Sequence, residues 1–231
     1  MNPGGGSGRA GDYLEVLYRL LFPVGEYRPS EAAAPIAARV ADMLGVSRAS
    51  AGEMIKRLVE QQLIERGPGR SLALTKRGIE LAEHSVRATR VIECFLVDYL
   101  GYDPAEVNAL AVAMRDAFTP EITGRLHERL GSPERCPHGW PIGAAEARRE
   151  SGRLQRLAEL EAGSRCEIVG VVETDPELVR WLFGAGLVPG AGLRVSDVQP
   201  AAGHVTVGLR RNGDVVVGDR AARQVFVTQP R

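Results

Sequence analysis

The sequence predicts a mainly α chain that ends in a small domain of short β-strands. Three observations support this fold class. Residues 40–78 follow the order helix, turn, helix and two short strands around a Gly-Pro-Gly-Arg tip, which is typical of an N-terminal winged helix-turn-helix. Residues 79–130 carry apolar side chains at helical spacing. Residues 166–228 contain short β-branched runs separated by turn residues.

The first helix of the helix-turn-helix has clear start and stop signals. Val40, Met43 and Leu44 lie at positions i, i+3 and i+4, which is the apolar stripe of a helix. Gly45 then breaks this helix. Ser47 is a good N-cap for the next helix, because its hydroxyl oxygen can accept a bond from a free backbone N–H.

The second helix has a polar outward face that suits DNA. Met54, Ile55 and Leu58 repeat the apolar spacing and point to the core. Short polar residues near a helix N-terminus allow close approach to base edges and phosphates. An ordinary helical hairpin with a solvated face is the alternative. The residues that we expect to contact double-stranded DNA are Ser47, Arg48, Ser50, Gly52, Lys56 and, beside the wing tip, Arg70.

Composition places the chain among ordinary globular proteins. Its 231 residues are 44% hydrophobic and 25% charged, and the formal net charge is zero. Charge is uneven, however, since residues 45–90 hold nine Lys or Arg against five Glu. Such a local excess favours phosphate contacts, although solvated helix faces have a similar pattern.

Apolar runs, the N-terminal segment and the cysteines indicate where the protein is located in the cell. It has no run of 18 apolar residues, so we expect no membrane-spanning helix. The Gly-rich residues 1–10 do not have the apolar segment of a signal peptide, and we expect them to form a disordered tail. The three cysteines are sparse and odd in number, which favours a cytoplasmic protein with reduced thiols.

Four further helices are predicted, over residues 12–22, 75–100, 104–117 and 120–130. The third of these is apolar on more than one face, through Val107, Leu110, Ala111 and Met114. A partner subunit often covers such a surplus of apolar surface, so we expect a homodimer, with packing inside one chain as the alternative.

The C-terminal part changes character after a Pro- and Gly-rich loop at residues 132–143. Residues 144–157 are polar and predict a linker or an exposed helix. Five β-branched runs then follow, interrupted by one helix at residues 176–186, which predicts a small SH3-like β-barrel. The runs are residues 166–173, 192–198, 204–209, 214–218 and 224–228.

Four segments together resemble the diphtheria toxin repressor and manganese transport regulator family of metal-dependent transcription factors. DYLEVLYRL is similar to the family's opening helix and VSRASAGEMIKRL to its recognition helix. CPHGWPI resembles the loop that closes its dimerisation domain. LFGAGLVPGAGLRV resembles the FeoA-type, SH3-like domain of longer members.

This resemblance implies a function and a domain order. It implies a repressor that binds a palindromic operator as a dimer when Fe²⁺ or Mn²⁺ is present. A metal-trafficking or protein-interaction module on the same fold is the alternative. The implied domains are a winged helix at 11–78, a helical dimerisation domain at 79–143, a linker at 144–157 and an SH3-like domain at 158–231.

The resemblance also implies metal ligands. Asp12 and Glu15 lie where manganese-type members place two carboxylates, and Glu93 matches a ligand of one of the family's two sites. Asp116 is a candidate substitute ligand.

Several positions depart from the family's pattern. Thr89 and Asn108 replace ligand histidines, Val112 replaces a Cys or Glu ligand, and Arg115 stands beside Asp116 in place of a Glu-His pair. A guanidinium repels a divalent cation. We therefore hypothesise that Arg115 pairs with Asp12 or Glu15 and replaces a metal-mediated link by a salt bridge, for which arginine's planar fork is suited.

The remaining Cys, His and Glu candidates give weaker evidence for a functional site. Cys136 and His138 are two residues apart without a second Cys/His pair, which favours a structural loop over a metal site or a nucleophile and base. Cys94 is expected to be a small buried residue, with soft metal ligand as the alternative, and Glu173 matches a position from which the barrel reaches a metal site. No catalytic constellation is present, so we do not expect an enzyme.

Overall fold

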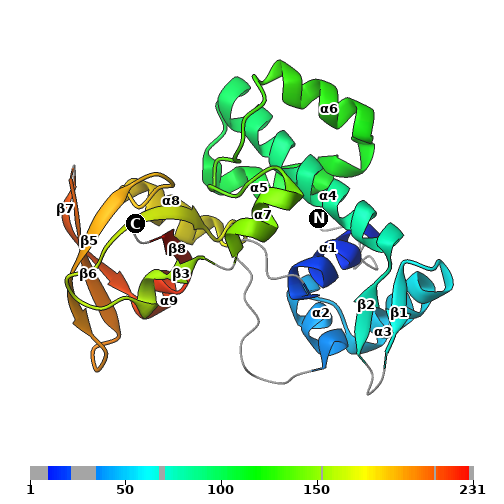
Figure 1. The fold of residues 1–231 in the computed structure, drawn as a ribbon, viewed down its shortest axis with the longest axis horizontal. Helices are drawn as coiled ribbons and strands as arrows, with labels where there is room; N and C mark the ends of the chain where they lie inside the picture. Colours follow the sequence, from blue (N-terminus) through cyan, green and yellow to red (C-terminus); the bar gives the residue numbers. More distant parts are fainter. Residues whose placement is uncertain (1–9, 22–34, 68–70, 152, 211, 229–231) are drawn as a thin grey trace, which may run out of the picture. The chain divides into compact units, whose positions relative to one another are not determined.

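A computed structural model describes residues 10–21, 35–67, 71–151, 153–210 and 212–228. The chain divides into two compact units, Met1–Arg87 and Ala88–Arg231, which are described separately. Figure 1 shows the elements of both units. Ala10, the last residue of the predicted tail, begins helix α1, while residues 1–9 and the wing residue Arg70 lie outside the described residues. Among the described helices, none combines the length and apolar character needed to cross a bilayer.

The first unit is a winged helix-turn-helix. Helices α1, α2 and α3 pack on one another, and β1 pairs antiparallel with β2 to form the wing (Figure 1). The apolar side chains of α3 that the spacing predicted are buried. The elements are α1 (Ala10–Leu21), α2 (Ile36–Leu44), α3 (Arg48–Glu60), β1 (Ile64–Arg66), β2 (Leu72–Leu74) and the start of α4 (Lys76–Cys94).

Local chemistry explains the turns of this unit. Gly45 ends α2 with φ 62°, a left-handed conformation that glycine adopts without strain. Ser47 caps α3 by accepting a hydrogen bond of 3.0 Å from the Ser50 backbone N–H. At the start of α4, Gly78 packs so closely on the residue before β1 that an added Cβ would lie 2.1 Å from the carbonyl oxygen of Leu63.

The second unit begins with helices. The predicted long helix is present, but its last turn widens into a π-helix, a feature often found near functional sites. Asp103 and Thr119 cap the two helices that follow through their side-chain oxygens. The elements are the π-helix η2 (Phe95–Tyr99), α5 (Pro104–Met114), the 3₁₀ turn η3 (Arg115–Ala117), α6 (Pro120–Arg129) and α7 (Ala144–Ser151).

A six-stranded antiparallel sheet forms the C-terminal part of this unit, in the order β3-β8-β4-β5-β6-β7. Turns and helices connect the strands, and α8 lies between β4 and β5 in the chain (Figure 1). The elements are β3 (Gln155–Arg156), η4 (Leu157–Glu159), β4 (Arg165–Val171), α8 (Pro176–Gly184), β5 (Gly192–Gln199), β6 (His204–Leu209), β7 (Gly213–Gly218), α9 (Asp219–Ala222) and β8 (Val225–Thr228).

Two parts of the predicted fold class are wrong. The chain is a mixed helical and β protein rather than mainly α, because the sheet fills most of the C-terminal part. The predicted barrel is not closed, since β3 and β7 lie at opposite edges of the sheet. β3 has two residues, which is too short to complete a ring of strands.

A hydrophobic core joins the sheet to the helices within this second unit. Trp140, from the loop before α7, packs edge-on against Phe226 of β8 with ring centroids 5.3 Å apart. Val91 and Cys94 of α4 belong to the same hydrophobic core. This core fixes the loop at residues 135–142 between α4 and the sheet.

Candidate metal centre and nucleic-acid interface

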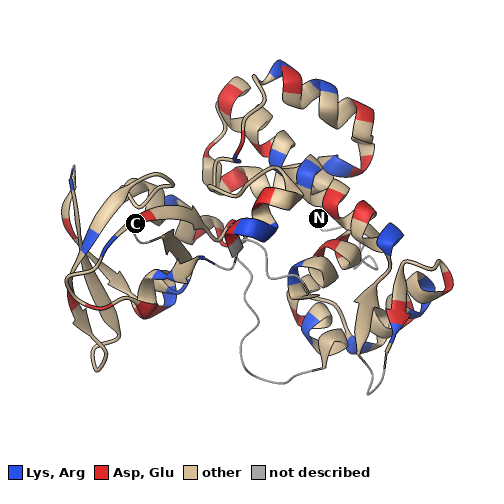
Figure 2. Ribbon diagram, in the orientation of Figure 1, with Lys and Arg blue, Asp and Glu red and all other residues tan. Residues whose placement is uncertain are grey.

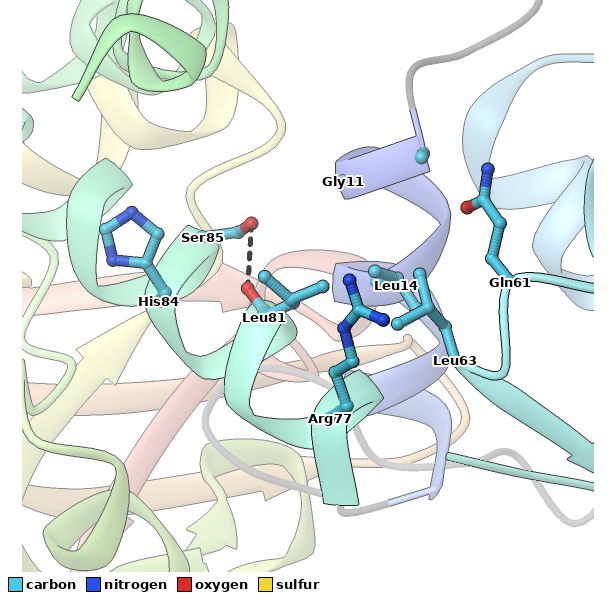
Figure 3. Close-up of a pocket in the computed structure, with 9 residues that line it drawn as sticks. Gly11, Leu14, Gln61, Leu63, Arg77, Leu81, His84 and Ser85 are labelled. Carbon is cyan, nitrogen blue, oxygen red and sulfur yellow. Dashed lines mark hydrogen bonds between the residues drawn. The ribbon is translucent and has the colours of Figure 1, made fainter. Parts of the chain in front are cut away.

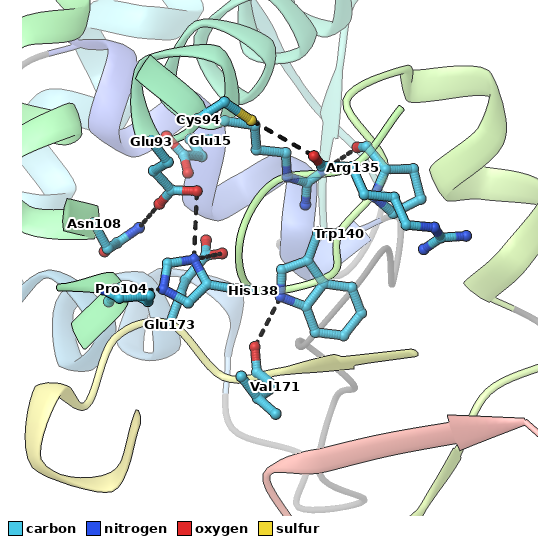
Figure 4. A network of polar contacts seen from close by, with 12 residues as sticks. Glu15, Glu93, Cys94, Pro104, Asn108, Arg135, His138, Trp140, Val171 and Glu173 are labelled. Carbon is cyan, nitrogen blue, oxygen red and sulfur yellow. Dashed lines mark hydrogen bonds and ion pairs between the residues drawn. The ribbon is translucent and has the colours of Figure 1, made fainter. Parts of the chain in front are cut away.

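Four buried side chains from distant parts of the second unit converge on one point. They are Glu93, Cys136, His138 and Glu173, and their ligand atoms all lie within 4.8 Å of one another. Glu93 comes from the last turn of α4, and Cys136 and His138 come from the loop before α7. Glu173 comes from the segment after β4, and Figure 4 shows it with Glu93 and His138. We call this group the buried cluster.

Hydrogen bonds orient the donors of the buried cluster. His138 Nε2 lies 2.8 Å from the carbonyl oxygen of Pro104, so Nε2 carries a proton and donates it. The other ring nitrogen, Nδ1, therefore faces Glu93 Oε2 at 3.5 Å and Glu173 Oε2 at 3.8 Å. Asn108 Nδ2 donates to the second oxygen of Glu93 at 3.0 Å, which turns Oε2 toward the imidazole (Figure 4).

The loop that carries Cys136 and His138 is docked on β4 by its backbone. The Trp140 indole N–H donates to the carbonyl oxygen of Val171 at 2.9 Å, and the Val171 N–H donates to that of His138 at 3.0 Å. Gly139 has φ 93°, and an added Cβ would lie 2.0 Å from the carbonyl oxygen of Val169. Glycine is thus required for this close approach.

Burial and charge set the protonation states of the cluster. Burial alone would lower the pKa of His138, but the close contacts and negative charges of Cys136 and Glu93 outweigh it and raise this pKa to about 12. Burial, followed by the Glu93 charge, raises the pKa of the Cys136 thiol. A positive charge is therefore strongly favoured between the carboxylates.

The donor set fits a divalent metal ion. Glu93 Oε2 and His138 Nδ1 are fully buried and make no hydrogen bond with any described residue, although they face each other. Buried polar atoms without partners are costly unless something satisfies them. Two carboxylates, an imidazole and a thiol supply the O, N and S ligands of transition-metal sites, and the cation would take the place of the proton on His138.

The candidate nucleic-acid interface lies in the first unit. The N-cap Ser47 and, on α3, Arg48, Gly52 and Lys56 are exposed. Ser50 is half-buried, and its hydroxyl lies 2.9 Å from that of Ser47. Basic and acidic residues both occur along α3 and the wing (Figure 2). The exposed face of α3 therefore combines short polar and basic residues.

A hollow in the first unit is a separate feature. Its lining combines Leu14, Leu63 and Leu81 with Arg77 and other residues (Figure 3). None of the predicted metal ligands or DNA-contacting residues lines this hollow, so it contributes nothing to either candidate site.

Comparisons with known proteins decide the family. Residues 75–143 match the iron dependent repressor, metal binding and dimerisation domain, and residues 155–229 match the FeoA domain. The iron-dependent repressor IdeR of Mycobacterium tuberculosis is 29% identical over 228 residues, covering 94% of this chain and 96% of the relative. The transcriptional regulator MntR of Escherichia coli is 37% identical over 106 residues, covering 46% and 59%.

A solved manganese-dependent transcriptional repressor in complex with manganese superposes with a TM-score of 0.84 at 28% identity, covering 96% of this chain and 100% of the other. The chain belongs to the diphtheria toxin repressor and manganese transport regulator family. Members of this family are repressors and not enzymes.

Within this repressor family, the predicted metal ligands of the chain fall in different places. Glu93 is part of the buried cluster. The side chain of Asp116 is 47% exposed and lies 4.0 Å from Arg115, outside the cluster. Asp12 and Glu15 belong to α1 in the first unit, where Glu15 forms an ion pair of 2.6 Å with Arg19. The role of Asp12, Glu15 and Asp116 as ligands stays a prediction.

Sequence reasoning undervalued the other members of the cluster. Cys136 and His138 do form a structured loop, as expected, but they also face Glu93 and Glu173. The C-P-H motif signalled nothing alone because its partners are carboxylates far away in sequence. Cys94, the alternative soft ligand, is outside the cluster and donates its thiol hydrogen to the Arg135 carbonyl at 3.5 Å. The match of Glu173 to a family position was the available signal.

Proposed function

We propose that this chain is a transcriptional repressor that binds a palindromic DNA operator as a homodimer when the buried cluster holds Fe²⁺ or Mn²⁺. The observation that carries this proposal is the convergence of Glu93, Cys136, His138 and Glu173 in a chain that also has a winged helix-turn-helix. The repressor relatives support the same combination of metal input and DNA output.

The donor set favours Fe²⁺ over Mn²⁺. Carboxylates and imidazole accept both ions, but the thiolate of Cys136 is a soft ligand that binds Fe²⁺ better than Mn²⁺. The same Irving–Williams trend raises the affinity of nitrogen ligands for iron. Bound metal would join α4, the loop before α7 and the segment after β4 at one point.

DNA contact is assigned to α3 and the wing. Arg48 and Lys56 would contact phosphates, while Ser50 and Gly52 would let the helix approach base edges. Ser47 would support them as the cap of α3, which is its observed hydrogen-bonding role. Arg70, outside the described residues, is proposed as a wing contact.

Exposed apolar residues support a dimer. Around the end of α4 and in α5, the side chains of Tyr99, Leu100, Tyr102 and Leu110 are all more than a third exposed, with Tyr99 at 69%. Water contact with several neighbouring large apolar residues is unfavourable, and a second copy of the chain would cover them.

Arg115 is proposed to replace a second metal site. Its side chain is 3% exposed, and its ion pair with Asp116 is long at 4.0 Å. Arginine's planar fork suits bidentate contact with a carboxylate. We propose that Arg115 pairs with Asp12 or Glu15, and that charge reversal in a double variant, Arg115→Glu with Asp12→Arg, restores DNA affinity lost in Arg115→Glu.

A binding experiment tests the proposed function. Metal-loaded protein is mixed with the DNA upstream of its own gene, and complexes are separated on a gel, with an unrelated DNA of the same length as control. We expect a shift at protein concentrations at least about tenfold lower for the upstream DNA. Equal binding to both DNAs, or binding to neither, contradicts a repressor and favours an interaction module.

A further inference from the structure

The exposed face of α3 carries an acid in its centre. Glu53 is exposed, one turn after Ala49 and one turn before Arg57, while Ala51, Met54 and Ile55 on the opposite face are buried. Glu53 is thus in the part of α3 that would enter a DNA groove. An acid there is unexpected, because it repels phosphates.

The acid forms no ion pair with the part of the chain that the structure describes. At the spacing i, i+4, an acid and an arginine pair on other helices, namely Glu15 with Arg19, Glu121 with Arg125 and Asp219 with Arg223. Glu53 and Arg57 have this spacing, yet no ion pair joins Glu53 to any of the described residues. Its carboxylate is available to a partner outside the chain.

The residue before it leaves room for such a partner. Gly52 is in the helix interior, where glycine costs about 0.5–1 kcal/mol relative to alanine. An added Cβ at Gly52 would meet nothing within 4 Å, so packing inside the chain does not require glycine there. The open space next to Glu53 suits the close approach of a base pair.

Base chemistry then selects the partner of the carboxylate. A carboxylate accepts hydrogen bonds, and the exposed donors in the major groove are cytosine N4 and adenine N6. Adenine N6 lies beside the acceptor N7, which repels a carboxylate, whereas cytosine N4 has no acceptor beside it on its own base. We propose that Glu53 accepts a hydrogen bond from N4 of a cytosine and thereby selects a C·G pair in each half of the operator.

This inference rests on the proposed function, and one experiment separates the two. Metal-loaded wild type, Glu53→Gln and Glu60→Gln are each used to select DNA from a library of randomised duplexes. Glu60, in the last turn of α3, is exposed and gives the same change of charge away from the helix centre.

We expect wild type and Glu60→Gln to require C·G at one position of each half-site. Glu53→Gln should lose that preference by about 5- to 150-fold and prefer adenine there, because glutamine pairs with adenine N6 and N7. Its salt dependence should not change, since no phosphate contact is altered.

Three results would overturn the inference. Glu53→Gln could select the same base pair as wild type with equal discrimination. It could also bind every sequence more tightly by the same factor, which would make Glu53 a phosphate repellent without base preference. Finally, a wild-type protein that selects no sequence would refute the proposed function itself. It would also refute the proposed role of Glu53 in selecting a base pair.

Discussion

At the scale of single residues, the acidic groups of the buried cluster repel one another electrostatically unless a cation lies among them. Glu93 and Glu173 bring two carboxylates next to a thiol in a fully buried site. His138 relieves this repulsion when it holds a second proton, which is why its pKa is raised to about 12. A divalent ion would relieve it more fully and displace that proton.

Removing one donor tests this arrangement. Cys136→Ser should lower the affinity for Fe²⁺ by more than about 100-fold, because even outer hydrogen-bonding partners such as Asn108 contribute about 10- to 100-fold. Isothermal titration under anaerobic conditions measures the affinity. Cys166→Ser is the control, since Cys166 is a buried thiol in the sheet core. Equal losses in both variants would argue against the cluster.

The raised pKa values predict how pH acts. Because Cys136 and His138 must lose protons to bind metal, the affinity should rise by about tenfold per pH unit for each proton released. Without metal, stability changes with pH in the opposite direction. The stability that protonated His138 contributes is complete below about pH 6.5 and is lost as pH rises toward about 12.

Thermal unfolding at several pH values checks this dependence. The increase in Tm caused by saturating Fe²⁺ should grow between about pH 6 and 8. An increase that shrinks over this range would show that the metal does not compete with these protons.

At the scale of elements, the loop before α7 determines whether the cluster forms. Gly139→Ala places a Cβ against the Val169 carbonyl oxygen and forces a positive φ on alanine. We expect a loss of about 1–3 kcal/mol in the free energy of unfolding and weaker metal binding. Gly163→Ala is matched, since Gly163 also has positive φ but its added Cβ meets nothing within 4 Å. It should be destabilised without losing metal affinity.

Helix α3 should show a conflict between stability and function. Gly52→Ala is expected to raise the free energy of unfolding by about 0.5–1 kcal/mol and to weaken DNA binding, because the methyl group fills space kept for DNA. Gly124→Ala in α6 is the control, since its added Cβ also meets nothing within 4 Å. It should stabilise without changing DNA affinity. Tighter DNA binding by Gly52→Ala would contradict the assigned face.

The elements also show what sequence can predict. Periodicity and caps placed α3 and its buried side, because Ser47, Met54 and Ile55 act through local rules. The open sheet was not predicted, since closure depends on the pairing of β3 and β7, which no local pattern encodes. Likewise, Glu93 and His138 are adjacent because of the core formed by Trp140 and Phe226, and sequence spacing does not show that contact.

At the scale of the whole molecule, helix α4 contributes residues both to the winged-helix unit and to the candidate metal centre. It begins directly after the wing strand β2 and carries Glu93 in its last turn, followed by the π-helix η2. Metal bound to Glu93 would fix this end of α4 to the loop before α7 and to the segment after β4. Differences in metal occupancy would then change DNA affinity through this helix, as linkage requires.

The most direct test of metal-controlled DNA binding is the affinity for operator DNA with and without Fe²⁺. Fluorescence anisotropy under anaerobic conditions would compare chelator-treated and Fe²⁺-loaded wild type with Cys136→Ser under both conditions. We expect Fe²⁺ to tighten wild-type binding by about 5- to 150-fold and to have little effect on the variant at the same metal concentration. Identical wild-type affinities after exhaustive chelation and after Fe²⁺ loading would contradict control by the buried cluster.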